Sequence, residues 1–175
     1  MTAVTVGIGP LTIDEVVRVA RHGAPVVLDA EAIAGMGASR AVIESLAGDA
    51  RPHYGISTGF GALATKHIPV DRRLELQRSL VRSHAASSGP EVEEEVVRGT
   101  MLLRLSTLAT GRTGIRPIVA ETYAALLNAG ITPVIGEYGS LGCSGDLAPL
   151  AHIALAVMGE GDVRVRGEQM PAARA

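Results

Sequence analysis

Helical periodicity is the feature that most restricts the folds open to this chain. In its clearest stretch, apolar side chains recur at intervals of four, four and three residues, at Val97, Met101, Leu105 and Leu108. Residues at these intervals lie on one face of an α-helix, so the segment is predicted to be amphipathic. The acidic run from 91 to 95 is predicted to form its first turns, where the helix dipole favours negative charge.

Residues that favour helix starts mark four more segments with the same period. Thr12 and Glu15 have the spacing of a capping box, which predicts a short helix at this point. Asp29, Asp71 and Asp146 are each expected to cap a further helix through the side-chain carboxylate. The four predicted segments are 12–21, 29–46, 71–84 and 146–158.

Two other residues bound one more helix, which is followed by extended chain. Pro117 suits a first helical turn, because its missing amide hydrogen would have no partner there, and Gly130 suits a C-terminal stop. The stretches 131–135 and 163–166 are predicted to be extended. Helices dominate this pattern, and we therefore predict a single all-α domain over residues 1–175 with little or no sheet.

Composition excludes several classes of function. Lys and Arg total 16 and Asp and Glu total 18, and without a basic run the chain offers no electrostatic footprint for nucleic acid. Hydrophobic residues make up 47% of the chain, enough for a core, but no apolar stretch approaches the roughly 20 residues that span a bilayer. The single cysteine, Cys143, favours a reducing cytoplasm, and no His or Cys at ligand spacing predicts a metal site.

The segment from 136 to 145 carries a glycine at every third residue and ends in Cys143-Ser144-Gly145. If this chain bends tightly, the amide nitrogen of Gly145 can attack the carbonyl carbon of Cys143 and close a five-membered ring. Loss of one water completes the ring, and loss of the Ser144 hydroxyl as a second water leaves a methylidene carbon. Gly145 suits this step because it lacks a Cβ and tolerates strained dihedrals. The product would be an electrophile at a helix N-terminus.

The same residues allow two other interpretations. The segment could be a glycine-rich turn that leads into a capped helix and has no chemistry of its own. Alternatively, Ser144 could be a hydrolase nucleophile with His84 or His152 as its base. The esterase elbow G-x-S-x-G is not present, however, because Gly145 follows the serine directly.

Read together with the loop Tyr54-Gly-Ile-Ser-Thr-Gly-Phe-Gly, the segment 139–150 resembles the aromatic amino acid ammonia-lyase family, most closely its histidine-specific members. In that family an Ala-Ser-Gly triplet cyclises to 4-methylideneimidazol-5-one. The resemblance implies that the triplet 143–145 forms this group, with a cysteine in place of the alanine, and that Tyr54 is a catalytic tyrosine. Ser57 departs from the asparagine that is usual in the tyrosine loop.

The resemblance also implies a substrate. The dipeptide Ser83-His84 matches the pair that faces the substrate side chain in histidine-specific members. The expected activity is non-oxidative deamination of L-histidine to urocanate and ammonia, without a metal or a soluble cofactor. The expected assembly is a homotetramer whose long-helix bundle is absent from residues 1–175, so that the chain corresponds to the N-terminal third of the enzyme.

Rival functions remain open at this point. A tyrosine or phenylalanine lyase, or an aminomutase that returns the ammonia, would carry the same group. A serine hydrolase and a non-catalytic helical module that binds partners belong to other classes. We further expect the stripe of Val97, Met101, Leu105 and Leu108 to lack partners within the chain. An uncovered apolar face would favour association, and we expect the 175 residues alone not to deaminate histidine.

Overall fold

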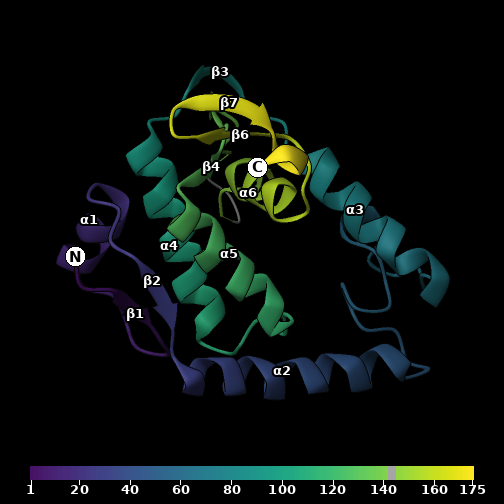
Figure 1. Cartoon of the computed structure of the whole chain (residues 1–175). Coiled ribbons are helices and arrows are strands. Elements are labelled where there is room, and N and C mark those ends of the chain that lie inside the picture. The colour runs from purple at the N-terminus through teal and green to yellow at the C-terminus, as the bar shows by residue number, and fades with distance from the viewer. Residues whose placement is uncertain (142–144) are drawn as a thin grey trace.

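The computed structural model describes residues 1–141 and 145–175 and is built mainly from helices (Figure 1). Across these ranges its α-helices are α1 (Ile13–Ala20), α2 (Ala30–Gly48), α3 (Arg73–His84), α4 (Glu94–Ala109), α5 (Pro117–Ala129) and α6 (Leu147–Val157). The strands are β1 (Val4–Val6), β2 (Val26–Leu28), β3 (Ser88–Glu91), β4 (Ile131–Pro133), β5 (Gly136–Tyr138), β6 (Asp162–Val165) and β7 (Glu168–Pro171). Short 3-10 turns occupy Gly61–Leu63, Val70–Arg72 and Ala172–Arg174.

Little sheet was predicted, and the few short strands agree with this, but the stricter description all-α is not confirmed. Strand β1 pairs in parallel with β2, β3 pairs with β5, and β4, β6 and β7 form an antiparallel sheet in that order. Each strand has only three or four residues, too few for an alternating pattern to stand out in a sequence. Their role is to join segments that lie between the helices.

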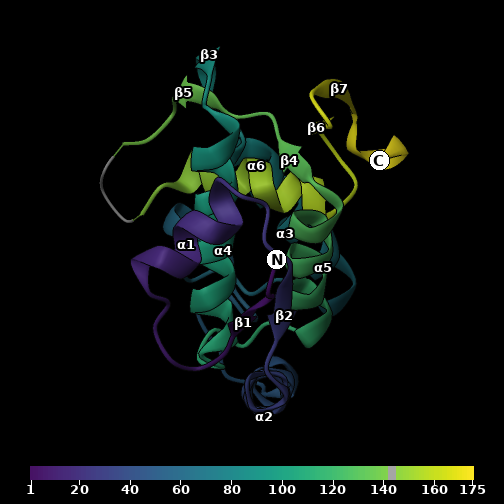
Figure 2. The ribbon, with the colours of Figure 1, turned by 60° about the vertical axis from the view of Figure 1, so that its left-hand side comes forward.

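The core forms around α4 and α5, which lie side by side with α1 on one flank (Figures 1 and 2). Helix α2 crosses beneath this pair and is seen end-on in Figure 2. The apolar stripe of α4 is buried, with Val97, Met101, Leu105 and Leu108 each at most 3% exposed. The expectation that this stripe lacks partners within the chain was therefore wrong, because α1, α2, α5 and the β1–β2 pair cover it.

Several predicted helix ends are confirmed by their hydrogen bonds. At α1, the Glu15 amide donates to Thr12 Oγ1 (3.3 Å) and the Thr12 amide donates to Glu15 Oε2 (2.8 Å), which completes the capping box. The carboxylate of Asp29 accepts from the amide at the start of α2. Pro117 occupies the first turn of α5, and Gly130 ends it with a left-handed φ of 68°.

Three other predicted helix starts were wrong in their position or their cap. Asp71 lies in a 3-10 turn, and α3 begins after it without a side-chain cap. Glu91 lies in β3 and pairs with Arg164 of β6 instead of opening α4. Asp146 precedes α6 as predicted, but its carboxylate accepts from the Ser140 hydroxyl and caps no amide of the helix.

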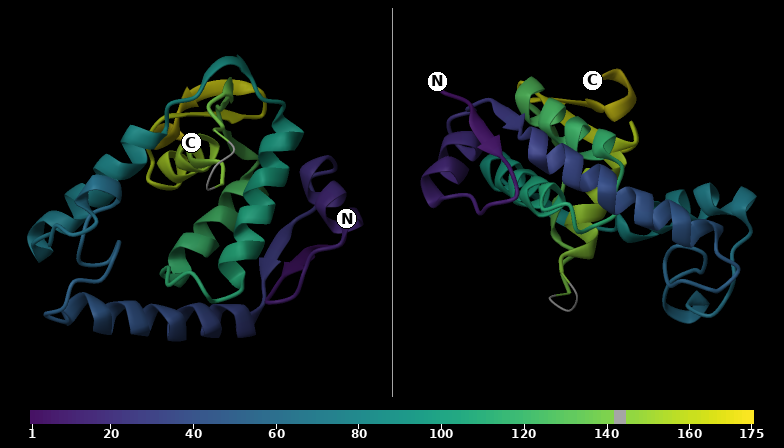
Figure 3. Two further views of the ribbon diagram at one scale, coloured as in Figure 1. Left: turned by 180° about the vertical axis from the view of Figure 1, so that it is seen from behind. Right: turned by 90° about the horizontal axis from the view of Figure 1, so that it is seen from below.

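A second part of the fold, residues 49–84, extends away from the core and is called the arm here (Figure 3). It consists of the segment 49–72 and α3, and α2 links it to the core. In the arm only Ser57, Thr58 and Gly59 are buried, and α3 has no buried residue. Among the described residues, no helix combines the length and the apolar character that a membrane span would need.

Candidate functional site

The loop that carries Tyr54 folds around a single backbone carbonyl. The carbonyl oxygen of His53 accepts from the amides of Ile56 (3.1 Å), Ser57 (3.0 Å) and Thr58 (3.3 Å). The Thr58 hydroxyl donates to the carbonyl of Gly59 at 3.0 Å, and Thr58 is only 2% exposed. These local bonds give residues 53–59 a defined shape, although the rest of the arm contributes no buried side chain.

The aromatic contact in this loop explains one of its glycines. The rings of Tyr54 and Phe60 meet edge to face with centroids 5.6 Å apart and planes at 80°. Gly55 between them has φ of +71°, and a Cβ there would approach the Phe60 ring to 2.8 Å. Tyr54 itself is 64% exposed. The loop therefore presents the tyrosine at the surface of this chain, where a substrate or another polypeptide can reach it.

His84 is the last residue of α3 and is half-buried, on the same face as Leu76 and Leu80. Its Nδ1 lies 2.8 Å from the Leu80 carbonyl oxygen and 3.0 Å from Ser83 Oγ. A carbonyl oxygen only accepts, so Nδ1 carries the proton in this contact. In the neutral ring, Nε2 is then the unprotonated nitrogen, which can accept a hydrogen bond from an N–H group.

The third predicted site element precedes α6. Cys143 and Ser144 lie outside the described residues. Gly145 has φ of +91°, a left-handed conformation that favours glycine. Apart from its neighbours in the chain, no atom of the described residues lies within 4 Å of the position of a Cβ there. Its carbonyl accepts from the Leu147 amide at 2.9 Å, and the bond from Ser140 to Asp146 joins the two sides of the segment.

His152 of α6 forms hydrogen bonds with the chain that lies beside this segment. Its Nε2 accepts from the amide (3.2 Å) and the hydroxyl (2.8 Å) of Ser87, and Ser87 Oγ accepts from the Gly136 amide at 2.9 Å. Burial lowers the pKa of His152, which favours the neutral ring that can accept these bonds. These bonds give the half-buried His152 a structural role. Ser87, which bridges β5 and α6, was not predicted as part of this site, because its partners lie 49 and 65 residues away.

The structure brings only part of the predicted site together. Helix α3, which ends at His84, packs against α6, which begins just after Gly145. Tyr54 lies on the loop between α2 and α3. Within the described ranges, no hydrogen bond, ion pair or ring contact joins Tyr54, His84 and Gly145 to one another. The geometry thus places two elements of the site as neighbours and leaves the tyrosine facing outward.

Known proteins resemble this chain along nearly its whole length. A family model for aromatic amino acid lyases matches residues 11–175. Histidine ammonia-lyase of Streptomyces griseus is 56% identical over 98% of this chain and 35% of its own length. The structure of a tyrosine aminomutase from Streptomyces globisporus is 42% identical, with a TM-score of 0.92 over 99% of this chain and 32% of its own. Histidine ammonia-lyase from Trypanosoma cruzi is 35% identical, with a TM-score of 0.89 over 99% of this chain and 33% of its own. The chain thus spans about a third of the length of these relatives.

Proposed function

Because this chain belongs to the aromatic amino acid lyase family, we propose that it provides part of the active site of an enzyme that eliminates ammonia from L-histidine to give urocanate. The observation that carries the proposal is the 56% identity with a histidine ammonia-lyase over 98% of the chain. The geometry of His84 supports it, because the ring nitrogen left free by the Leu80 carbonyl suits an imidazole N–H. The single cysteine of this chain supports the cytoplasm as the compartment of the enzyme.

The reaction needs help at two points, because the β-hydrogen of an amino acid is not acidic and ammonium is a poor leaving group. We propose that Cys143-Ser144-Gly145 forms 4-methylideneimidazol-5-one, which supplies an electrophile that accepts electrons from the substrate. Tyr54 is proposed to take the β-proton, and His84 to accept a hydrogen bond from the imidazole. Negative charge that develops beside Gly145 is stabilised by the N-terminal end of α6.

The residues around the triplet fit this group. Ring closure requires the nitrogen of residue 145 to approach a carbonyl two residues earlier, and Gly145 already has the left-handed backbone that a side chain would disfavour. The bond from Ser140 to Asp146 and the contacts of His152 hold both flanks of the segment. The side chain of residue 143 takes no part in the ring, so a cysteine in place of alanine leaves the chemistry unchanged.

The complete site is proposed to require more polypeptide than this chain. The chain covers about 35% of the length of a curated relative. Among the described residues, no hydrogen bond, ion pair or ring contact joins Tyr54 to His84 or Gly145. We propose that the enzyme is a homotetramer in which segments equivalent to the rest of the relatives bind the substrate carboxylate. The exposure of Tyr54 and the lack of buried residues in α3 support a further covering layer over the arm.

The function is tested with a chimera in which this chain replaces the matching part of the Streptomyces griseus enzyme. We expect the chimera to convert L-histidine to urocanate, to be two waters lighter than its translation, and to absorb to the red of tyrosine. The Ser144→Ala variant is the matched control, because it has no hydroxyl to lose. Full translated mass, no such absorbance and no urocanate would overturn the proposal, and fluorophosphonate labelling of Ser144 would indicate a hydrolase.

A tyrosine aminomutase is the second candidate, because a protein of that name is 42% identical and superposes with a TM-score of 0.92. The two functions differ in their products. An aminomutase retains the nitrogen as a β-amino acid, whereas a histidine lyase releases ammonia and urocanate. Incubating the chimera with tyrosine and with histidine, followed by amino-acid analysis, separates them.

His84→Leu is expected to lower kcat/KM for histidine in the chimera by about 5–150-fold. The variant leaves a buried polar group of the substrate without a partner, which costs roughly 1–3 kcal/mol. Steady-state kinetics with histidine and with phenylalanine measure the effect, and His22→Leu, at an exposed position, is the control. Unchanged turnover of histidine by His84→Leu would show that this residue has only a structural role.

A further inference from the structure

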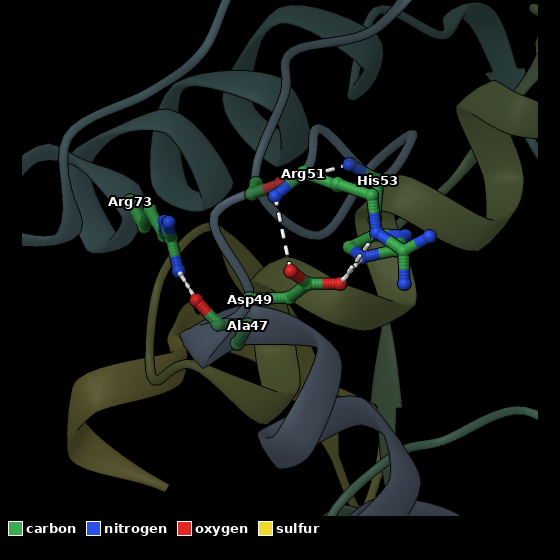
Figure 4. Close-up of polar contacts among 6 residues, drawn as sticks. Ala47, Asp49, Arg51, His53 and Arg73 are labelled. Carbon is green, nitrogen blue, oxygen red and sulfur yellow. Dashed lines mark hydrogen bonds and ion pairs between the residues drawn. The ribbon is translucent and has the colours of Figure 1, made fainter.

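The residue directly after α2, at its C-cap position, is an aspartate, which is unusual because the C-terminal end of a helix disfavours negative charge. Asp49 occupies this position, and its carboxylate is surrounded by donors (Figure 4). Oδ2 lies 2.9 Å from His53 Nε2 and 3.3 Å from Arg51 Nε, and Oδ1 accepts from the Arg51 amide at 3.1 Å. These contacts lower the pKa of Asp49, the Arg51 amide having the largest influence and His53 the next.

The two partners of this carboxylate differ in how firmly they are held. The side chains of Asp49 and His53 are 27% and 23% exposed, whereas that of Arg51 is 84% exposed. An ion pair with an exposed arginine contributes little, because solvent screens it and the side chain loses entropy. The His53 contact is more shielded, and Nε2–H donates both in the charged ring and in one neutral tautomer. His53 is therefore the partner that matters for geometry.

His53 is also the residue on which the tyrosine loop is built. Its amide donates to Ser57 Oγ at 2.9 Å, and its carbonyl accepts the three amides of residues 56, 57 and 58. Tyr54 follows directly in the chain, and its ring meets the ring of Phe60 edge to face. The direction of the tyrosine is consequently set by the backbone at His53, which the Asp49 contact ties to the end of α2.

A separate contact closes the base of the same segment. Arg73, the first residue of α3, donates through NH1 to the Ala47 carbonyl (2.8 Å) and through Nε to the Ile68 carbonyl (3.1 Å), as Figure 4 shows in part. It satisfies a carbonyl in the last turn of α2, which would otherwise have no helical partner. Arg73 thus joins α2 to α3, whereas the Asp49–His53 pair acts within the loop itself.

We propose that Asp49 and His53 are positioning residues for Tyr54, holding the tyrosine loop in a fixed orientation against the end of α2. This inference rests on the proposed function only for its catalytic consequence, because the contacts themselves are independent of the reaction. The pair acts through the backbone and touches neither the substrate nor the reacting atoms.

The first test measures the loop directly in this chain. Amide hydrogen exchange at Ile56, Ser57 and Thr58 is expected to quicken about 5–30-fold in His53→Ala, the change that the loss of a bond of roughly 1–2 kcal/mol produces. His53→Gln keeps a donor and is expected to restore most of the protection. Arg51→Ala alters the same carboxylate without touching the loop and is the matched control. Equal exchange in His53→Ala and the parent would overturn the proposal.

The second test asks whether the orientation matters for catalysis, again in the chimera. Asp49→Ala and His53→Ala are expected to lower kcat for histidine about 5–30-fold with little change in KM, while mass and near-ultraviolet absorbance stay at parent values. The kcat of the double variant is expected to equal that of either single variant, because both substitutions remove the same Asp49–His53 contact. An inactive parent would refute the proposed function and leave the exchange experiment to decide. If the parent chimera is active and both variants have the same kcat as the parent, the positioning role is refuted and the proposed function is not.

Discussion

Arg98→Ala is expected to lower the free energy of unfolding by about 3–5 kcal/mol, a large share of the stability of a domain this size. Arg98 lies in the first turns of α4 and is 7% exposed. Its Nε and NH2 donate to the Val19 carbonyl at 3.2 and 3.0 Å, and NH1 donates to the Leu127 carbonyl at 3.2 Å. Both carbonyls belong to the last turns of helices, α1 and α5, where cations are favoured.

Two costs combine in this variant. The carbonyls of Val19 and Leu127 lose the donors of Arg98, and the space of the arginine stem becomes a cavity. Burial lowers the pKa of Arg98, but a guanidinium remains protonated at neutral pH, so the native interaction is that of a cation with two carbonyl dipoles.

Denaturant unfolding followed by circular dichroism measures the difference. Arg98→Met fills the space without the donors and is expected to lie between alanine and the parent. Arg112→Ala, at an exposed position after α4, is the control and is expected to stay within about 0.5 kcal/mol. A loss below 1 kcal/mol in Arg98→Ala would mean that the two carbonyls find water instead.

Arg98 also shows where sequence reasoning stops. The helix around it was predicted correctly from the stripe of Met101 and Leu105, because periodicity is a local property. Arg98 follows an acidic run, however, and this local pattern indicates a solvent-exposed side chain that pairs with Glu94. Its actual partners lie 79 and 29 residues away. No local pattern carries that information.

The same distinction separates the parts of the candidate site. Tyr54, His84 and Gly145 were found from short motifs and the family they resemble, and their roles stay predictions. The contacts that hold them were not predicted. Ser87 meets His152 only through the tertiary fold. The nearby strands β3 and β5 are too short for an alternating pattern to be detected in the sequence. His53 lies only four residues from Asp49, but its role depends on where α2 ends, and helix ends are the least certain part of a prediction.

The amides of α3 are expected to exchange with solvent at least roughly 10³-fold faster than those in the middle of α4. Helix α4 has eight buried residues and lies at the centre of the core, so its amides exchange only when the domain unfolds. Helix α3 has none. Helix α3 is held by α6 and, at its first residue, by the bonds of Arg73 to the Ala47 and Ile68 carbonyls. The bidentate pair of Arg82 with Glu160 adds bonds of 2.7 and 2.8 Å between side chains that are 58% and 31% exposed. A pair this exposed contributes at most about 1 kcal/mol.

Amide exchange is measured residue by residue in this chain and in the chimera. The comparison tests both the difference in exchange rate between α3 and α4 and the proposed covering layer. Arg82→Ala should quicken exchange in α3 alone and leave α4 at the parent rate. In the chimera, α3 should become protected, because the proposed further layer would cover Leu74, which is 63% exposed in this chain. Protection of α3 in the 175-residue chain equal to that of α4 would show that the arm is stable by itself. A covering layer over α3 would then be unnecessary, and a site shared between polypeptides would lose its structural support.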